Sequence, residues 1–312
     1  MVVSLIFIIL IGMKTAKRRL LISMIVGLNL FNATVIYKLW WAELQQVKNT
    51  KKKKSTQPTK VKSHLATDTA IRAQVFMPIK GRSYKLSTVA MQKLQDYRIR
   101  QRKLAMRYPG LIFFNGDTAK KEVALTFDDG PDGQITLQVL KVLAKYKVKG
   151  SFFFVGNYVQ KYPQIARQAY KQGHLILNHS HTHQSYINKS KQWIKQDLLA
   201  AENAIAQAIG RRPAMFRPPY GDIDSVIIGE VHANKYKGII WSYDTLDWTG
   251  IVKDSIAQGV KSGIRSGEIV LMHSRQGTMP TAQALPDIIM YLQDAGYAIV
   301  SLDKMLKVKA YK

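Results

Sequence analysis

Polar residues that could carry out chemistry directly follow three short apolar segments of the chain. The segments read VALTF, HLILN and EIVLM, and each has the length and the Val, Ile and Leu content of a buried strand. The residues that follow these segments are Asp128 with Asp129, His179, and His273. Because an α/β barrel places its reactive groups where its strands end, we expect these side chains to meet at one rim.

A divalent metal site is predicted from one carboxylate and two imidazoles. Asp129, His179 and His183 offer one oxygen and two nitrogen ligands, the open three-ligand set typical of catalytic zinc. His179 and His183 are four residues apart, so we expect a helical turn that brings both rings to one face. Zinc fits this set best, but cobalt, nickel or manganese can occupy the same ligands. The pattern indicates a metal-dependent hydrolase.

Five short motifs occur along the second half of the chain. They are TFDDGP (126–131), HSHTH (179–183), RPPYG (217–221), DTLDW (244–248) and LMH (271–273). In this order they resemble the motifs of the polysaccharide deacetylases, the NodB-homology or carbohydrate esterase family 4 enzymes. Five motifs in order are a far more specific signal than any one of them. The resemblance implies an α/β fold, a distorted (β/α) barrel with fewer than eight repeats.

The resemblance also implies roles for residues that follow the predicted strands. Asp128 is then the general base, Asp129 is a metal ligand, and Arg217 pairs with Asp128. His273 is the general acid that protonates the departing amine, since imidazole titrates near neutral pH. Asp247 hydrogen-bonds to that imidazole and tunes it.

Three further residues are implied to contact the substrate. The backbone N–H of Tyr220 would donate to the oxyanion of a tetrahedral intermediate, and Trp248 and Leu271 would enclose the acetyl methyl group. The chain departs from the family at Ser274, where the family often has Asp. No residue that carries a family role is missing. A catalytically silent glycan-binding scaffold, the alternative of another class, would require the loss of a ligand or of the base.

The implied activity is the removal of N-acetyl groups from a cell-surface glycan. Peptidoglycan N-acetylglucosamine is the leading substrate that the resemblance implies. A poly-N-acetylglucosamine exopolysaccharide and chitin oligomers remain alternatives, because anchoring at a membrane does not separate these glycans.

Basic charge is concentrated before the predicted enzyme. Residues 1–120 hold 23 Lys and Arg but only 4 Asp and Glu, whereas the rest of the chain holds 24 and 16. An excess of this size favours anionic surfaces. Nucleic acid is not an expected partner, because the basic segment 48–62 has no interleaved aromatic residues. The chain has no cysteine, which excludes a disulfide framework and thiolate metal sites.

A membrane anchor is predicted near the N-terminus. Residues 20–37 are 18 residues without a charge, about 27 Å long as a helix, and Trp40 and Trp41 follow where an aromatic belt would lie. We therefore expect a single-pass protein of the cell membrane with an extracellular catalytic domain. A cleaved signal peptide starting at Met13 is the alternative, but no A-x-A-like cleavage site follows.

The predicted organisation has five parts. They are a basic segment (1–19), the transmembrane anchor (20–41), a basic linker (42–63), an N-terminal extension that packs on the barrel (64–120) and the deacetylase domain (121–306). Within the extension, Ser87 is expected to cap a helix that runs to about residue 108 and turns its Arg and Lys side chains to solvent. A strand, turn and strand over 111–127 and a single strand over 238–243 are also expected.

Overall fold

Short, buried segments rich in β-branched and aromatic residues form the centre of the fold. The computed structural model describes residues 75–312, and within this range nine strands form one sheet. The predicted anchor and linker lie outside the described residues. No helix within 75–312 is long and apolar enough to cross a membrane. The strands are β1 (Ile112–Phe113), β2 (Glu122–Asp128), β3 (Ser151–Phe154), β4 (Leu175–Asn178), β5 (Met215–Phe216), β6 (Lys237–Ile239), β7 (Tyr243–Asp244), β8 (Glu268–His273) and β9 (Ala298–Ile299).

The sheet is parallel and curls into a half-barrel. Its order is β1-β6-β5-β4-β3-β2-β8-β7, and β9 pairs with β2. β2 and β8 pair over six residues, from Val123 opposite Glu268 to Asp128 opposite His273. This register brings Asp128 and His273 to the same end of adjacent strands, as the sequence predicts.

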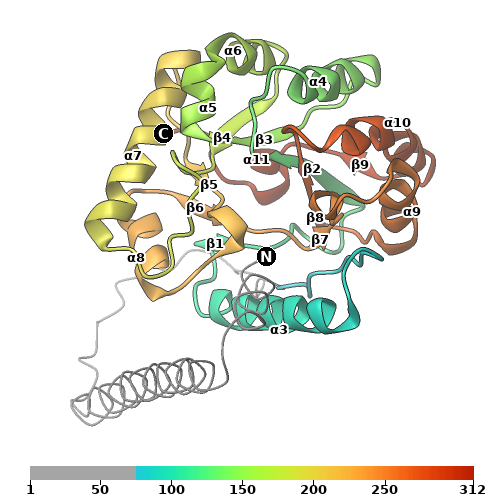
Figure 1. The fold of residues 1–312 in the computed structure, drawn as a ribbon, viewed down its shortest axis with the longest axis horizontal. Coiled ribbons are helices and arrows are strands. Elements are labelled where there is room, and N and C mark those ends of the chain that lie inside the picture. The colour runs from blue at the N-terminus through green and yellow to red at the C-terminus, as the bar shows by residue number, and fades with distance from the viewer. Residues whose placement is uncertain (1–74) are drawn as a thin grey trace, which may run out of the picture. The chain divides into compact units, whose positions relative to one another are not determined.

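Helices cover the outside of the sheet (Figure 1). Most of them connect consecutive parallel strands, the alternation that the sequence predicts for this fold class. The helices are α3 (Thr88–Ala105), α4 (Ile135–Lys145), α5 (Gly156–Lys161), α6 (Pro163–Lys171), α7 (Lys191–Ile209), α8 (Ser225–Ala233), α9 (Lys253–Gly263), α10 (Met279–Asp294) and α11 (Leu302–Leu306), with short 3-10 turns η1 (Pro219–Gly221) and η2 (Asp247–Thr249).

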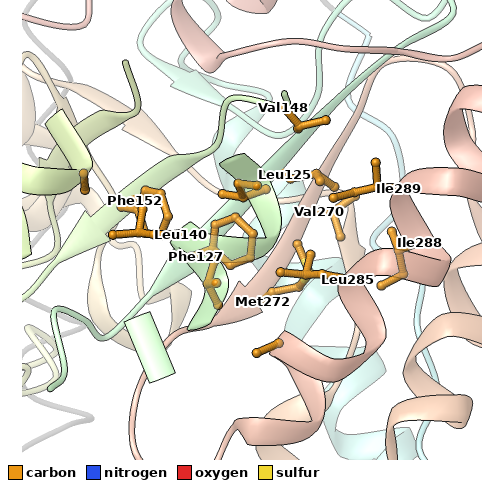
Figure 2. Close-up of a cluster of buried hydrophobic side chains, with 14 of the residues drawn as sticks. Leu125, Phe127, Leu140, Val148, Phe152, Val270, Met272, Leu285, Ile288 and Ile289 are labelled. Carbon is orange, nitrogen blue, oxygen red and sulfur yellow. The ribbon is translucent and has the colours of Figure 1, made fainter. Parts of the chain in front are cut away.

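Alternation along β2 separates an outer core from the inside of the curl. Figure 2 shows Phe127 of β2 beside Phe152 of β3, with ring centroids 5.0 Å apart, in the core that also holds Leu285 of α10. Thr126 and Asp128, the alternate residues of β2, point the other way and both accept hydrogen bonds from Arg217. The outer face of β2 packs in this core, while its inner face presents polar groups toward the end of the strand.

The predicted single strand over 238–243 is wrong. β6 pairs with β5 and β1, whereas β7 pairs with β8 at the other end of the sheet order. Between them the chain leaves the ladder at Ile240 and Trp241, and both side chains are buried. The continuous apolar composition hides this crossing, because each strand is only two or three residues long.

The two strands predicted within 111–127 are formed, but they do not pair with each other. β1 pairs in parallel with β6, through Ile112 opposite Gly238, and not with β2. The apolar pattern identifies the strands correctly, but it carries no information on which strand becomes the neighbour.

The helix predicted after Ser87 is confirmed. The Oγ of Ser87 accepts a hydrogen bond from the N–H of Ala90 at 3.2 Å, and the helix ends at Ala105. The expectation that its basic side chains face solvent is wrong for Arg98, which is buried and donates to Asp244 Oδ2 at 2.8 Å. The segment before the helix pairs with β7, the last strand in the sheet order, because Lys80 forms a parallel bridge with Tyr243. α3 is thereby fixed beside β7 (Figure 1).

Candidate active site

The predicted metal ligands come together where β2 and β4 end. Asp129 directly follows β2, His179 directly follows β4, and His183 lies in the next loop. One ligand atom from each lies within 4.8 Å of the others. Asp129 Oδ1 is 2.9 Å from His183 Nε2 and 3.3 Å from His179 Nε2.

The donor set fits a divalent cation. Asp129 Oδ1 is buried and has no hydrogen-bond partner within residues 75–312, although two ring nitrogens face it. His179 Nδ1 lies 2.7 Å from the carbonyl oxygen of Arg217, and because a carbonyl only accepts, Nδ1 carries the proton. The lone pair of His179 Nε2 then faces the carboxylate, the tautomer that a metal-binding histidine uses.

The HSHTH segment is not the helical turn that its spacing predicts. It is an irregular loop in which Ser180 has φ 69° and His183 has φ 56°. The hydroxyl of Ser180 accepts from the N–H of His183, and Asp197 on α7 accepts from the N–H of His181. These bonds bring the two imidazole rings to 5.0 Å. The loop reaches the expected geometry by a different backbone path, and the supporting role of Asp197 has no signal in the motifs.

The second oxygen of Asp129 is held by a residue that the sequence analysis missed. Arg275 Nε donates to Asp129 Oδ2 at 2.8 Å, from a side chain that is 44% exposed. Burial raises the pKa of Asp129, but the adjacent imidazoles of His179 and His183 outweigh it and hold that pKa well below its ordinary value. Arg275 lies two residues beyond the LMH motif, and that proximity is the only signal the sequence offers.

Asp128 is fixed by a fully buried guanidinium. Arg217 Nη1 donates to Asp128 Oδ1 at 2.7 Å, and its Nε and Nη2 groups donate to the carbonyl oxygens of Ile239 and Ile240. Burial lowers the pKa of Arg217, and the charge of Asp128 offsets only part of this effect. The free oxygen, Asp128 Oδ2, lies 3.8 Å from His179 Nε2. The carboxylate of Asp128 therefore lies next to the predicted metal ligands but is not one of them.

His273, at the end of β8, is partly buried and forms a second pair, with the fully buried Asp247. Its Nδ1 lies 2.7 Å from Asp247 Oδ1, while Asp247 Oδ2 accepts from the backbone N–H of His273 and from the hydroxyl of Thr281. Burial lowers the pKa of His273, but the attraction of Asp247 and its hydrogen bond raise that pKa to about 9. Nε2 remains as the proton-bearing atom that is not bound to Asp247. Thr281, which anchors Asp247, was not predicted.

One cavity of about 350 Å³ joins these groups. Tyr220 and Trp248 are 60% and 42% exposed, whereas Leu271 is buried. Tyr220 has φ 60°, and its ring lies 5.0 Å from that of His183. Of the ten predicted site residues, Arg217 and Asp247 lie behind the wall and the other eight line the cavity: Asp128, Asp129, His179, His183, Tyr220, Trp248, Leu271 and His273.

The sequence of this chain is similar to known glycan deacetylases. The sequence model described as "Polysaccharide deacetylase" matches residues 115–239. Two peptidoglycan-N-acetylglucosamine deacetylases of Bacillus cereus are each 33% identical, one over 62% of this chain and 71% of its own length, the other over 64% and 95%. The peptidoglycan-N-acetylmuramic acid deacetylase PdaC of Bacillus subtilis is 33% identical over 62% of this chain and 40% of its own length. The chain belongs to the polysaccharide deacetylase family, and it is homologous to peptidoglycan N-acetylglucosamine deacetylases.

Solved structures share the half-barrel. The crystal structure of a peptidoglycan N-acetylglucosamine deacetylase in complex with 4-naphthalen-1-yl-N-oxidanyl-benzamide superposes with a TM-score of 0.63 at 31% identity, covering 65% of this chain and 95% of that one. A pseudoenzyme of carbohydrate esterase family 4 from Bacillus anthracis gives 0.60 at 26% identity, covering 64% and 70%. The NodB-type fold expected from the motifs is thus confirmed. Because this fold also occurs in a pseudoenzyme, activity must be argued from the site.

Proposed function

We propose that this chain is a metal-dependent hydrolase that removes N-acetyl groups from a cell-surface glycan, with peptidoglycan N-acetylglucosamine as its substrate. The observation that carries the proposal is a complete set of groups around one cavity. Asp128 and His273 line the same cavity as the metal ligands. Behind the cavity wall, Arg217 is paired with Asp128, and Asp247 is paired with His273. The names of the similar proteins supply the substrate class.

Asp129, His179 and His183 would hold the cation. When bound, it supplies Lewis acidity toward the acetamide carbonyl and makes water a stronger acid. Zinc suits one carboxylate and two imidazoles best. Arg275 keeps Asp129 oriented through its second oxygen, and the carbonyl of Arg217 keeps His179 in the tautomer that leaves Nε2 free.

The proton transfers are carried out by Asp128, paired with Arg217, and by His273, paired with Asp247. Asp128 accepts a proton from the attacking water as the new C–O bond forms at the acetamide carbon. His273 donates its Nε2 proton to the nitrogen as the C–N bond breaks, so acetate and a free amine leave. The backbone N–H of Tyr220 stabilises the oxyanion, and Trp248 and Leu271 enclose the methyl group.

We further propose that residues 20–41 anchor the chain in the cell membrane and that the catalytic domain is extracellular. The uncharged run of 18 residues and the flanking tryptophans support this placement, and an extracellular glycan substrate agrees with it.

Acetate release tests the function directly. The purified full chain is incubated with wall peptidoglycan and, separately, with poly-N-acetylglucosamine, before and after treatment with a chelator and after addition of zinc. We expect zinc-dependent acetate release, faster from peptidoglycan, and none from a His179→Ala variant. Retained glycan binding without acetate from either polymer would instead support the silent scaffold.

A further inference from the structure

One carboxylate outside the predicted motifs connects the N-terminal extension to two loops of the site. Asp222 directly follows the RPPYG motif. Its Oδ1 accepts a hydrogen bond from the hydroxyl of Tyr97 on α3 at 2.7 Å, and its Oδ2 accepts one from the hydroxyl of Ser185. We call Tyr97, Asp222 and Ser185 the tether. Tyr97 lines the cavity, whereas Asp222 and Ser185 lie outside its lining, so these two side chains can affect the site only through their neighbours.

The tether stands next to two residues of the candidate site that hold unusual backbone conformations. Tyr220 precedes Asp222 by two residues, and His183 precedes Ser185 by two residues. Tyr220 has φ 60° and His183 has φ 56°, a region in which a non-glycine residue stays only where the surrounding structure fixes it. Their rings lie 5.0 Å apart. The tether therefore restrains both loops at the point where they meet.

Of the two predicted imidazole ligands, His183 depends more on such a restraint. Its side chain is 26% exposed, whereas that of His179 is 3% exposed. His179 is also fixed through Nδ1, which lies 2.7 Å from the carbonyl oxygen of Arg217. Within residues 75–312 the ring of His183 has one polar contact, to Asp129 Oδ1 at 2.9 Å. The position of His183 Nε2 is therefore set by the loop that carries it.

Helix α3 provides a fixed end for the tether. Arg98, the neighbour of Tyr97, donates to Asp244 Oδ2 of β7 at 2.8 Å, and both side chains are 3% exposed. β7 is the last strand in the sheet order, whereas β5, which leads into the RPPYG motif, lies near the other end of that order. Through Arg98 and Tyr97, α3 thus spans the open side of the half-barrel. The helix precedes residues 115–239, which the family's sequence model matches.

The Tyr97 hydroxyl acts as a donor over the whole working range of pH. Burial, together with the hydrogen bond to Asp222 and the charge of Asp222, raises the pKa of Tyr97 above its ordinary value. The hydroxyl therefore keeps its proton and donates it to the carboxylate.

We propose that Tyr97 and Asp222 are positioning residues, which hold His183 through Ser185 and hold Tyr220 through the RPPYG loop. The inference rests on the proposed metal-dependent function and names the residues on which the geometry of the metal site depends. It makes α3 a part of the catalytic unit, although the helix supplies no metal ligand. Loss of the tether should displace His183 and leave Asp129 and His179 in place.

The test measures zinc affinity and folding separately in the full chain. Tyr97→Phe removes one hydroxyl and keeps the ring. Tyr291→Phe is the matched control, because the Tyr291 hydroxyl donates to the carbonyl oxygen of Lys261 at 2.8 Å and neither residue lines the cavity. The dissociation constant of zinc is measured by competition with a chelating dye, and the free energy of unfolding of the metal-free chain is measured in urea. NMR spectra of the metal-free chain report the imidazole signals of His179 and His183.

Two further variants examine the same connection. Ser185→Ala removes the other hydroxyl that Asp222 accepts from. Asp222→Ala removes the acceptor, and we expect the addition of Tyr97→Phe to Asp222→Ala to change zinc affinity little, because the hydroxyl then has no carboxylate through which to act.

We expect Tyr97→Phe and Ser185→Ala each to raise the dissociation constant of zinc about tenfold, at the lower end of the roughly 10–100-fold that supporting hydrogen bonds contribute to metal affinity. The signals of His183 should shift and those of His179 should stay. The control should lower the free energy of unfolding by a similar amount as Tyr97→Phe and leave zinc affinity unchanged.

Acetate release is measured beside these quantities so that the two proposals can fail separately. A dissociation constant within twofold of the wild-type value in both Tyr97→Phe and Ser185→Ala, or an equal loss of affinity in Tyr291→Phe, would overturn the positioning role while the hydrolase function stands. If both tether variants weaken zinc binding and the zinc-loaded wild-type chain releases no acetate from any glycan, the positioning role stands and the proposed function fails.

Discussion

Replacing Asp247 by Asn should lower the pKa of His273 and move the alkaline limit of activity toward neutral pH. The Asn side-chain oxygen can still accept from the backbone N–H of His273 and from Thr281, as Asp247 Oδ2 does, so the turn should keep its geometry. What the variant loses is the negative charge beside Nδ1, which favours the imidazolium.

The magnitude follows from the pKa of His273, which is about 9 in place of the ordinary 6.5. This difference corresponds to about 3 kcal/mol in favour of the protonated ring. Without the charge of Asp247, burial is offset only by the more distant Asp128 and Asp129, so we expect the pKa of His273 to return to near its ordinary value. The protonated fraction at pH 8 then falls from about nine tenths to about 3%, a loss of about 30-fold. Below about pH 5.5 the ring is protonated in both proteins, and this loss should vanish.

Two measurements check this expectation. NMR titration of the imidazole protons in the chelator-treated chain reports the pKa of His273 directly, and acetate release from pH 5 to 10 reports its consequence. Since His273 must hold a proton to donate it, the wild-type rate should fall as pH rises through the pKa, and the variant rate should fall at lower pH. Asp254→Asn, an exposed carboxylate on α9, is the control. An unchanged pKa of His273 in Asp247→Asn would refute the assignment of the raised value to this pair.

Other substitutions separate the remaining roles. Asp128→Asn should keep stoichiometric metal and lose roughly two to four orders of magnitude in acetate release, because an amide cannot take the proton. Asp129→Asn should instead weaken metal binding, because it removes the only anionic ligand, and His183→Ala should lose the metal, because two ligands hold the ion weakly; an unchanged metal affinity in either variant would contradict the ligand set. Phe127→Ala should lower the free energy of unfolding by about 3–5 kcal/mol in urea denaturation, because the ring is fully buried. A chain that starts at Ser63 should be soluble and active; a folded but inactive fragment would place part of the substrate site before Ser63.

The elements that carry the reacting groups could be predicted from the sequence. β2, β4 and β8 each lie within one residue of the apolar segments expected for them, because parallel strands buried on both faces appear as continuous apolar runs. The polar residues that end these runs meet at one edge because parallel strands share a direction. Local composition therefore predicts both the strands and the meeting of their ends.

Pairing between distant segments could not be predicted. The crossing between β6 and β7 depends on which strands these two- and three-residue segments pair with. Segments this short show no hydrophobic periodicity from which the pairing could be predicted. Arg98 pairs with Asp244 across 146 residues of sequence, and in a helix rich in Arg and Lys it cannot be told from the solvated residues. His179 and His183 lie close together as predicted, but His183 does so with a positive φ. Neither the residue type nor the spacing of the two histidines reveals this backbone conformation.

Asp129, His183 and Tyr220 all hold left-handed backbone conformations at the site, with φ of 69°, 56° and 60°. A non-glycine residue in this region costs roughly 1–2 kcal/mol, so the backbone geometry of the candidate site opposes folding. A lineage that no longer needs the reaction is free to place glycine or asparagine at these positions and become more stable. Inactive descendants of such a chain should therefore drift first at His183 and Tyr220, while the outer core around Phe127 stays as it is.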